Sequence, residues 1–472
     1  MISNKRTKYL VVFIALCCSH GFSQETTYVD IPLTDFRAFN QPDQNWVITT
    51  DFDSDFTKPW NLKRIKPGSG VALNNYSEKT HGHLVTNEEF GDLDLEFDFM
   101  MDKGSNSGIY LQGRYEIQLF DSWLKSNSTY ADCGGIYQRW IEEGGMKGYE
   151  GVSPLVNASY APGLWQHLRI IFKAPKFDDK GNKVANARFN EVYLNGVLIH
   201  NQVEVSGPTR ASLFHDEKSL GPLMFQGDHG KVALRNIRYR SIQKNVGKGK
   251  NSKSGINIIK PIKRPYLLRS FILFKGEKLN KVISLGHPSG LSYAYNLEKG
   301  ALLKVWRGNF MDVTDMWHHR GQAQLAKPLG NTISLSNSPA IALLSDFHEP
   351  WPDSIVPSMV HQGYTLDKTG VPKFTFNICG VNLTDYIVPL DDGMGFERTL
   401  TLNGEIDTNL YSRIISAESI VQISKEVYRV DGNYYVMIDK KFQSKKRETK
   451  TGQELLVNIG KVSSEITYSI IY

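Results

Sequence analysis

Residues 106–123 read NSGIYLQGRYEIQLFDSW and alternate apolar with polar side chains on both sides of a glycine, Gly113. In extended chain, alternate side chains share one face, so this stretch predicts two short strands that turn around Gly113. The apolar positions of the two strands are Ile109, Leu111, Ile117 and Leu119. The polar positions of the second strand are Arg114, Glu116 and Gln118, with their ends side by side.

A strand with one solvated face shows the same alternation, so this stretch alone does not define a site. A second polar cluster gives a reason to look for one. Residues 226–230 read QGDHG, end an apolar run and lead into another predicted strand.

The composition indicates a folded, β-rich protein of two or three domains. The chain has 472 residues, of which 40% are hydrophobic and 11% aromatic, and it contains 40 glycines. The formal net charge is +6, but the excess basic residues gather in a leader and in one later segment. No predicted folded segment is broadly basic, so we expect no nucleic-acid partner.

Residues 1–23 have the pattern of an export signal. A basic start at residues 5–8 precedes an apolar stretch from Tyr9 to Cys18 that is short for a membrane span. Gly21 and Ser23 provide small residues for cleavage after position 23. We expect a periplasmic or extracellular protein that is not integral to the membrane.

Export makes two roles of cysteine relevant, lipid attachment and disulfide formation. Cys17 and Cys18 raise the alternative of a lipoprotein, which is disfavoured because the residues directly before them, Leu16 and Cys17, are not small. After cleavage only Cys133 and Cys379 remain, in different predicted domains, so a disulfide framework is not expected.

The rest of the chain predicts an all-β fold. Short strands separated by turn signals fill residues 28–242, as in a two-sheet β-sandwich, and Asn195-Gly196 marks a tight hairpin. Residues 243–264 are rich in lysine without an acidic residue and predict an exposed linker. Residues 265–472 resume β patterning and predict a second β-rich domain of unknown role.

The second domain contains a Trp- and Arg-rich stretch from Trp306 to Gly321. Indole and guanidinium groups on loops suit sugar binding, but Trp306 and Trp317 could equally be core residues, which is the more ordinary role. The adjacent His318 and His319 are a weak metal signal because neighbours on a strand face opposite ways.

The pattern Glu116-x-Gln118-x-x-Asp121 invites comparison with sandwich glycosidases that use two carboxylates on one strand. Here the middle residue is an amide. Positions 116 and 121 differ by an odd number, which places them on opposite faces unless the strand has a bulge. The pattern therefore disfavours a conventional two-carboxylate hydrolase.

Residues from about 30 to 242 resemble the 3-keto-disaccharide hydrolase domain family, which has a concanavalin A-like jelly-roll fold. The matching pieces are Leu93-x-Leu-x-Phe97, Asn106-Ser-Gly-Ile, Arg114, Glu116-x-Gln118-x-x-Asp121, Gly135-x-Tyr137, Trp165, Asn195-Gly196 and Gln226-x-x-His229-Gly230-x-Val232-x-x-Arg235-Asn236-Ile237. Two departures are Gly134 in place of the more usual threonine and an extra loop at Phe177–Val184.

The resemblance implies a substrate oxidised to a ketone at C3 of the sugar. Such a ketone acidifies the C2 proton, so that base removal can expel the C1 oxygen before water adds. His229 is the first candidate for general acid/base and Glu116 the second, while Asp121 is a candidate to orient His229. The candidate substrate-binding residues are Asn106, Arg114, Gln118, Tyr137 and Gln226.

A divalent metal ion acting on the ketone is an alternative, with Glu116, Asp121 and His229 as its ligands, although their spacing does not require it. Two other functions stay open. One is a carbohydrate-binding module without catalysis, because fold does not determine function. The other is a conventional glycoside hydrolase that acts on unoxidised sugars.

Overall fold

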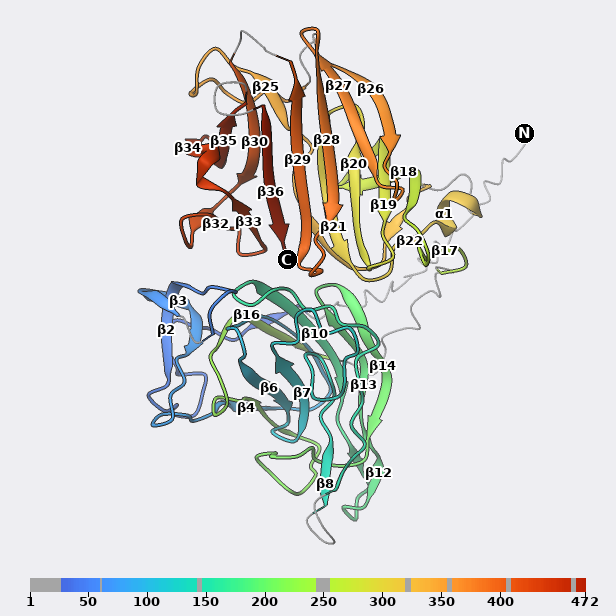
Figure 1. The fold of residues 1–472 in the computed structure, drawn as a ribbon. Helices are drawn as coiled ribbons and strands as arrows, with labels where there is room; N and C mark the ends of the chain where they lie inside the picture. Colours follow the sequence, from blue (N-terminus) through green and yellow to red (C-terminus); the bar gives the residue numbers. More distant parts are fainter. Residues whose placement is uncertain are drawn as a thin grey trace, which may run out of the picture.

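The computed structural model describes residues 27–59, 62–141, 147–242, 255–318, 324–354, 359–404, 409–459 and 464–472. The predicted signal segment, residues 1–23, lies outside the described residues. Almost all regular structure in the described part of the chain is β-strand, with one short helix, α1 (Thr314–Trp317), and one 3-10 turn. The predicted all-β class is confirmed. Figure 1 shows two β domains, the first coloured blue to green and the second yellow to red.

The first domain is a sandwich of two antiparallel sheets. The larger sheet has the order β14-β13-β10-β5-β16-β3-β2, with β1 added beside β16. Its strands are β1 (Val29–Asp30), β2 (Trp46–Asp53), β3 (Lys63–Asn74), β5 (Leu93–Met101), β10 (Trp165–Lys173), β13 (Ala187–Leu194), β14 (Val197–Val205) and β16 (Val232–Ser241). We call it the eight-stranded sheet.

The smaller sheet has the order β4-β15-β6-β7. Its strands are β4 (Leu84–Phe90), β15 (Gly221–Phe225), β6 (Asn106–Leu111) and β7 (Tyr115–Phe120). We call it the four-stranded sheet. Two hairpins, β8 (Arg139–Ile141) with β9 (Lys147–Tyr149) and β11 (Lys176–Phe177) with β12 (Lys183–Ala185), lie outside both sheets. The second hairpin occupies the extra loop predicted at Phe177–Val184.

Alternation puts one apolar row of each sheet into the shared core. The inward residues of β6 and β7, together with Leu95, Phe97 and Phe99 of β5, are at most 1% exposed and belong to one apolar cluster. At the predicted hairpin, Asn195 and Gly196 have φ values of 51° and 78° and join β13 to β14. Both features confirm what the alternation and the turn residues predicted.

The second domain also stacks β-sheets around an apolar core. Its sheet orders are β17-β22-β23, β18-β19-β20-β21-β24, β25-β30-β35-β34 and β26-β27-β28-β29-β36-β33-β32-β31. The strands are β17 (Ile258–Ile259), β18 (Tyr266–Phe274), β19 (Glu277–Gly286), β20 (Leu291–Asn296), β21 (Ala301–Arg307), β22 (Met311–Asp312), β23 (Lys327–Pro328), β24 (Asn331–Ser334), β25 (Ile341–Leu343), β26 (Met359–Leu366), β27 (Pro372–Ile378), β28 (Val381–Pro389), β29 (Gly395–Asn403), β30 (Leu410–Ala417), β31 (Ile420–Gln422), β32 (Val427–Val430), β33 (Tyr434–Ile438), β34 (Lys445–Thr449), β35 (Gly452–Asn458) and β36 (Glu465–Ile471).

The predicted linker at residues 243–264 lies partly outside the described residues, which resume at 255. Its described part contains β17, whose Ile259 is 9% exposed and pairs with Met311 of β22. The end of this lysine-rich segment is therefore attached to the second domain.

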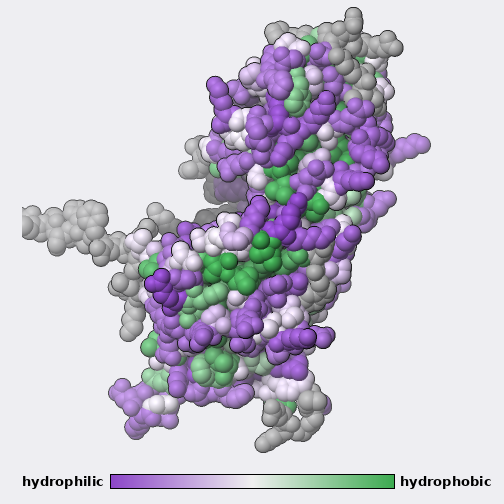
Figure 2. Space-filling view, turned by 90° about the vertical axis from the view of Figure 1, so that its left-hand side faces the viewer, coloured by the Kyte–Doolittle hydropathy of each residue, from purple (hydrophilic) through white to green (hydrophobic). Residues whose placement is uncertain are grey.

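The two domains share an apolar junction. Phe56, Ala161 and Leu164 of the first domain pack with Val427, Tyr435 and Ile471 of the second. Hydrogen bonds surround this cluster: the Trp165 amide donates to the Gly432 carbonyl at 2.8 Å, and the Trp123 indole donates to the Tyr472 carbonyl at 2.8 Å. In Figure 2, apolar side chains gather near this junction on an otherwise largely polar side of the molecule.

Candidate active site

The candidate site lies on the outward face of the four-stranded sheet. Because Ile109 and Ile117 point into the core, their neighbours Tyr110 and Glu116 point away from it, and the register pairs these two directly. Gly108 pairs with Gln118 one step along the ladder. The structure thus confirms that Glu116 and Gln118 lie on one face of β7, where they pair with Tyr110 and Gly108 of β6.

Glu116 is buried although it lies on this outward face. Its residue is 2% exposed, and the Tyr110 hydroxyl hydrogen-bonds its carboxyl group. Burial, together with the nearby negative charge of Asp228, raises the pKa of Glu116 to about 8 against the opposing effect of the Tyr110 hydrogen bond. Glu116 therefore carries a proton at neutral pH and can donate it.

Gly108 makes room for this carboxyl group. A Cβ atom built at Gly108 would lie 2.3 Å from Glu116 Oε1, well inside contact distance. Any side chain at position 108 would displace the carboxyl group.

The second polar motif reaches the same face through β15. The Gln226 amide donates to the Gly108 carbonyl at 2.9 Å, which extends the β15–β6 pairing past the end of the strand. Asp228 and His229 follow directly. Two segments about 110 residues apart in sequence thus converge on one sheet face.

His229 and Asp228 form an imidazole–carboxylate pair. The distance from His229 Nδ1 to Asp228 Oδ1 is 2.6 Å, so Nδ1–H donates to the carboxylate and Nε2 is left to accept a proton. The side chain of His229 is 54% exposed, whereas that of Asp228 is 31% exposed. His229 is thus the more exposed member of the pair.

Three predicted binding residues belong to the two polar motifs of this face. Gln226 is 8% exposed, places its Nε2 3.3 Å from His229 Nδ1, and has no hydrogen-bond partner in the described structure for its Oε1. Gln118 donates to Asn106 Oδ1 at 2.8 Å. These amides can offer donors and acceptors to sugar hydroxyls.

Tyr137 stands next to Glu116 along the sheet edge. Its backbone amide donates to the Glu116 carbonyl at 3.1 Å, and its half-buried ring packs edge-on against Tyr130. It is placed to border a bound ligand.

Arg114 occupies a buried position away from solvent. The residue is 2% exposed and donates to the Asp216 carbonyl and carboxylate and to the Gln112 carbonyl. The ring of Phe214 covers its guanidinium at 4.6 Å. In this arrangement Arg114 holds the loop at residues 212–217 against β7, and it offers no exposed donor to a ligand.

Asp121 anchors a turn. Its carboxylate accepts the Gly104 amide at 2.9 Å, and its own amide donates to the Ser105 carbonyl at 3.1 Å. Ser105 in turn donates to the Lys231 carbonyl at 2.6 Å, two residues after His229. The carboxylate that contacts the His229 ring is that of Asp228, so Asp121 supports the loop around His229 only through the backbone.

Burial raises the pKa of the Asp121 carboxyl group, whereas the Gly104 and Trp123 amides oppose this shift. Among the described residues, no group of three or more His, Cys, Asp or Glu side chains is arranged to hold a metal ion. Glu116, Asp121 and His229, all described, therefore do not form the triad considered from the sequence.

The Trp-rich stretch of the second domain divides between core and surface. Trp306 is fully buried, stacks on Phe310 and donates to its carbonyl at 3.1 Å, so it is a core residue. Trp317 on α1 is 51% exposed. His318 follows it, and His319 lies outside the described residues.

Sequence reasoning assigned no role to three residues of the site: Tyr110, Gly108 and Asp228. In the sequence, Tyr110 is not distinguished from the other residues of its strand, and Gly108 is only one position of the Asn106-Ser-Gly-Ile motif. Asp228 was visible beside His229, but its effect on Glu116 depends on the fold. A glycine directly across from a polar row is the signal that could have marked the space that the Glu116 carboxyl group fills.

Residues 39–242 match the model of the 3-keto-alpha-glucoside-1,2-lyase-like domain family. The match covers most of the first domain and less than half of the chain. The match confirms the resemblance predicted from the motifs and supports a glycoside hydrolase-like activity; it does not extend into the second domain.

Solved structures give weaker similarities. A "putative glycosyl hydrolase" from Parabacteroides distasonis is 22% identical, with 45% of this chain and 91% of that chain covered and a TM-score of 0.31. A second structure from the same organism is 21% identical, with coverage of 46% and 100% and a TM-score of 0.30. The binding domain of botulinum neurotoxin serotype D is 10% identical, with coverage of 95% and 93% and a TM-score of 0.24.

A comparison with curated proteins gives no match. Within the described segments, no helix has the length and apolar character that a membrane crossing requires.

Proposed function

We propose that the first domain cleaves the glycosidic bond of 3-keto-glucosides by removing the C2 proton and expelling the C1 oxygen. The observation that carries the proposal is the pairing of a buried, protonated carboxyl group at Glu116 with an exposed His229–Asp228 base on one face of a domain that matches this family. A protonated carboxyl group and an exposed imidazole on one face suit elimination, which needs both an acid and a base.

The proposed elimination begins at C2. His229 Nε2 accepts the C2 proton, and the electron pair is delocalised onto the C3 oxygen as an enolate. As the ketone re-forms, a double bond forms between C1 and C2, the C1–O bond breaks, and Glu116 protonates the leaving oxygen. Addition of water to the unsaturated sugar then completes hydrolysis.

The surroundings support this assignment of roles. Asp228 holds the imidazole with Nε2 facing outward and stabilises the imidazolium that forms. Tyr110 fixes the orientation of the Glu116 carboxyl group. The amides of Gln226, Gln118 and Asn106 border the site and are candidates to bind the ketone oxygen and the hydroxyls.

The test uses a 3-keto-glucoside carrying deuterium at C2, compared with the protonated substrate and with the unoxidised glucoside. We expect release of the leaving alcohol from the oxidised substrate, a primary isotope effect, and no release from the unoxidised one. Turnover of the oxidised substrate without an isotope effect, or no turnover of it, would contradict the proposal.

One observation favours a second candidate, a conventional hydrolase. The charge of Asp228 acts on Glu116, so the two carboxyl groups are close enough to interact, as the acid and the second carboxylate of a glycosidase do. Cleavage of the unoxidised glucoside in the same experiment would establish that function instead.

We also propose that the protein is exported to the periplasm or beyond, on the basis of residues 1–23. The N-terminal sequence of the protein purified from its native host tests this. Export predicts a start at residue 24, whereas a start at residue 1 would contradict it.

A further inference from the structure

A groove runs from the first domain across the junction onto the second domain. One part, of about 460 Å³, lies between the outer face of the eight-stranded sheet and the second domain. A wider part, of about 1080 Å³, continues over the second domain to Trp351. Lys275, Ser334 and Asp431 line both parts, so the two are continuous.

This groove is separate from the site around Glu116. Its wall in the first domain contains Asp98 and His167, which stand on the outer face of the eight-stranded sheet. Glu116 stands on the outer face of the other sheet. The two sites therefore occupy opposite faces of the sandwich.

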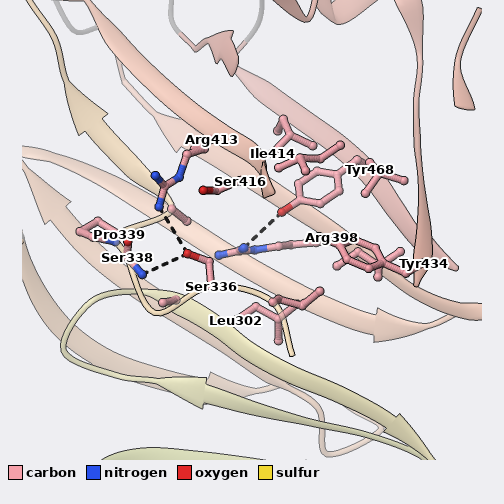
Figure 3. Close-up of a pocket in the computed structure, with 16 residues that line it drawn as sticks. Leu302, Ser336, Ser338, Pro339, Arg398, Arg413, Ile414, Ser416, Tyr434 and Tyr468 are labelled. Atoms are coloured by element: carbon pink, nitrogen blue, oxygen red, sulfur yellow. Dashed lines mark hydrogen bonds between the residues drawn. The ribbon is translucent and has the colours of Figure 1, made fainter. Parts of the chain in front are cut away.

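The walls of the groove are held in place. The junction hydrogen bond from Trp165 to Gly432 joins the two walls at the narrow part. At the wide part, Arg413 is 7% exposed and pairs with Glu454 at 2.6 Å, while its other nitrogen donates to Ser336 at 3.3 Å (Figure 3). A preformed groove binds without a large ordering cost.

Each end of the groove carries an indole with a stacked guanidinium. Arg235 lies 4.1 Å from the ring centroid of Trp165, and Arg413 lies 4.9 Å from that of Trp351. Both tryptophans are partly buried and line the groove. An indole beside a guanidinium offers apolar surface next to hydrogen-bond donors, a combination that suits sugar binding.

Between these ends lie polar groups that the described structure leaves unbonded. Asn433 and Ser334 have exposed side chains with no hydrogen bond among the described residues, and Lys275 has only a ring contact to Phe274 and the charge of Asp431 near it. They come from three separate parts of the second domain. Mixed donors and acceptors of this kind match hydroxyl groups.

The charge of the lining selects the ligand class. Five Lys or Arg residues face six Asp or Glu residues along the two parts of the groove. A nucleic acid or an acidic polysaccharide requires a clear excess of cations, which this groove lacks. A neutral ligand rich in hydroxyl groups fits instead.

We propose that this groove binds a neutral oligosaccharide of several sugar units and holds it on the protein, away from the site of cleavage. In this proposal the function of the second domain is to retain glycan on the protein. The choice of a glucan as the ligand rests on the proposed function of the first domain. The proposal that the groove binds a neutral oligosaccharide does not depend on that function.

The test measures binding of three neutral, unoxidised hexasaccharides, maltohexaose, cellohexaose and laminarihexaose, to the full chain by calorimetry. We use the Glu116→Gln background so that turnover plays no part. We expect at least one hexasaccharide to bind, and the double variant Lys275→Met/Asn433→Ala to weaken that binding at least tenfold.

The matched control is Lys278→Met, on the same β18–β19 hairpin but stacked on Phe271 outside the groove, which should leave the affinity unchanged. Equal melting temperatures establish that the variants are folded. Binding of none of the three at millimolar concentration, equal binding by the double variant, or binding of polygalacturonate alone would overturn the proposal. Cleavage of 3-keto-glucosides is assayed separately, so either proposal can fail without the other.

Discussion

The two outer faces of the first domain treat buried carboxyl groups in opposite ways. On the eight-stranded sheet, Asp94 and Glu96 each meet arginines, and the pKa of each is lowered, because hydrogen bonds from these cations exceed the raising effect of burial. On the four-stranded sheet, Glu116 meets a hydroxyl group and another carboxylate, and its pKa is raised.

The difference lies in the partners that each carboxyl group meets. Asp94 accepts from Arg169 at 2.9 Å and from Arg240 at 2.8 Å, a fully compensated arrangement that links three strands. Glu116 lacks a cation among the described residues, so its neutral form is favoured. A buried carboxyl group with a raised pKa and no cationic partner is the kind of group that the proposed function uses as a proton donor.

The largest expected effect comes from Glu116→Gln. The variant should lower turnover of a 3-keto-glucoside by about 10²–10⁴-fold, since it removes the proton donor without changing the shape of the site. Steady-state kinetics measure this. The matched variant Glu96→Gln, on the other face, should keep its activity; if both lose activity alike, the contrast between the faces is wrong.

Asp228→Asn should lower turnover less, by about 10–10²-fold, because His229 remains but loses its oriented carboxylate partner. Removal of the negative charge also lowers the pKa of Glu116. The alkaline limb of the rate profile, where Glu116 loses its proton, should therefore move to lower pH. A profile that keeps its position would show that Asp228 does not act on Glu116.

Asp94→Asn should have the opposite effect, with unchanged turnover and a loss of about 1–3 kcal/mol in the free energy of unfolding, because the partly exposed Arg169 and Arg240 lose a shared, buried partner. Urea denaturation at neutral pH measures it. Stability equal to that of the parent chain would show that these ion pairs are dispensable.

Stability against pH should also distinguish the faces. The folded-state pKa of Glu116, about 8, lies above its ordinary value of 4.5, so its contribution is fully present below pH 4.5 and is lost as the pH rises toward 8. The slope is at most about 1.4 kcal/mol per pH unit. The lowered pKa of Asp94 acts in the opposite sense, with stability present above its ordinary value of 3.8 and lost in acid.

Urea titrations across this range should thus show a flatter alkaline side for Glu116→Gln and a flatter acid side for Asp94→Asn. Parallel curves for the parent chain and Glu116→Gln between pH 5 and 8 would contradict the raised pKa.

The smallest expected effect is that of Trp123→Phe, which removes the hydrogen bond to Tyr472 across the junction. Trp123 lies two residues after Asp121, which anchors the turn beside Asn106. We expect a change of only a few-fold in KM with little change in kcat, and a stability loss of about 1 kcal/mol. Kinetics and urea denaturation of the same preparation measure both.

The local sequence pattern was enough to predict several strands and one turn of the fold. The strands at β5, β10, β32 and β33 and the turn at Asn195 follow from a period of two and from residues that tolerate positive φ. The convergence of residues 226–230 with β6 followed from family motifs, whereas spacing alone could not establish it.

Long-range partners were beyond sequence reasoning. Arg114 has the composition of a binding residue, but its carboxylate partner, Asp216, lies 102 residues away, and that pairing buries it. Trp306 likewise is followed in the sequence by the charged Arg307, whereas in the fold its ring stacks on the apolar Phe310. Such outcomes depend on which loops cover a strand, which alternation does not encode.

Gly108 offers a practical way to sort relatives of this domain in genome surveys. Because the space that a methyl group would fill there is taken by the Glu116 carboxyl group, a relative that keeps the glutamate but replaces the glycine must hold that acid elsewhere. Position 108 can therefore serve as a filter that separates sequences retaining the proton donor in this pose from those that have abandoned it, before any of them is expressed.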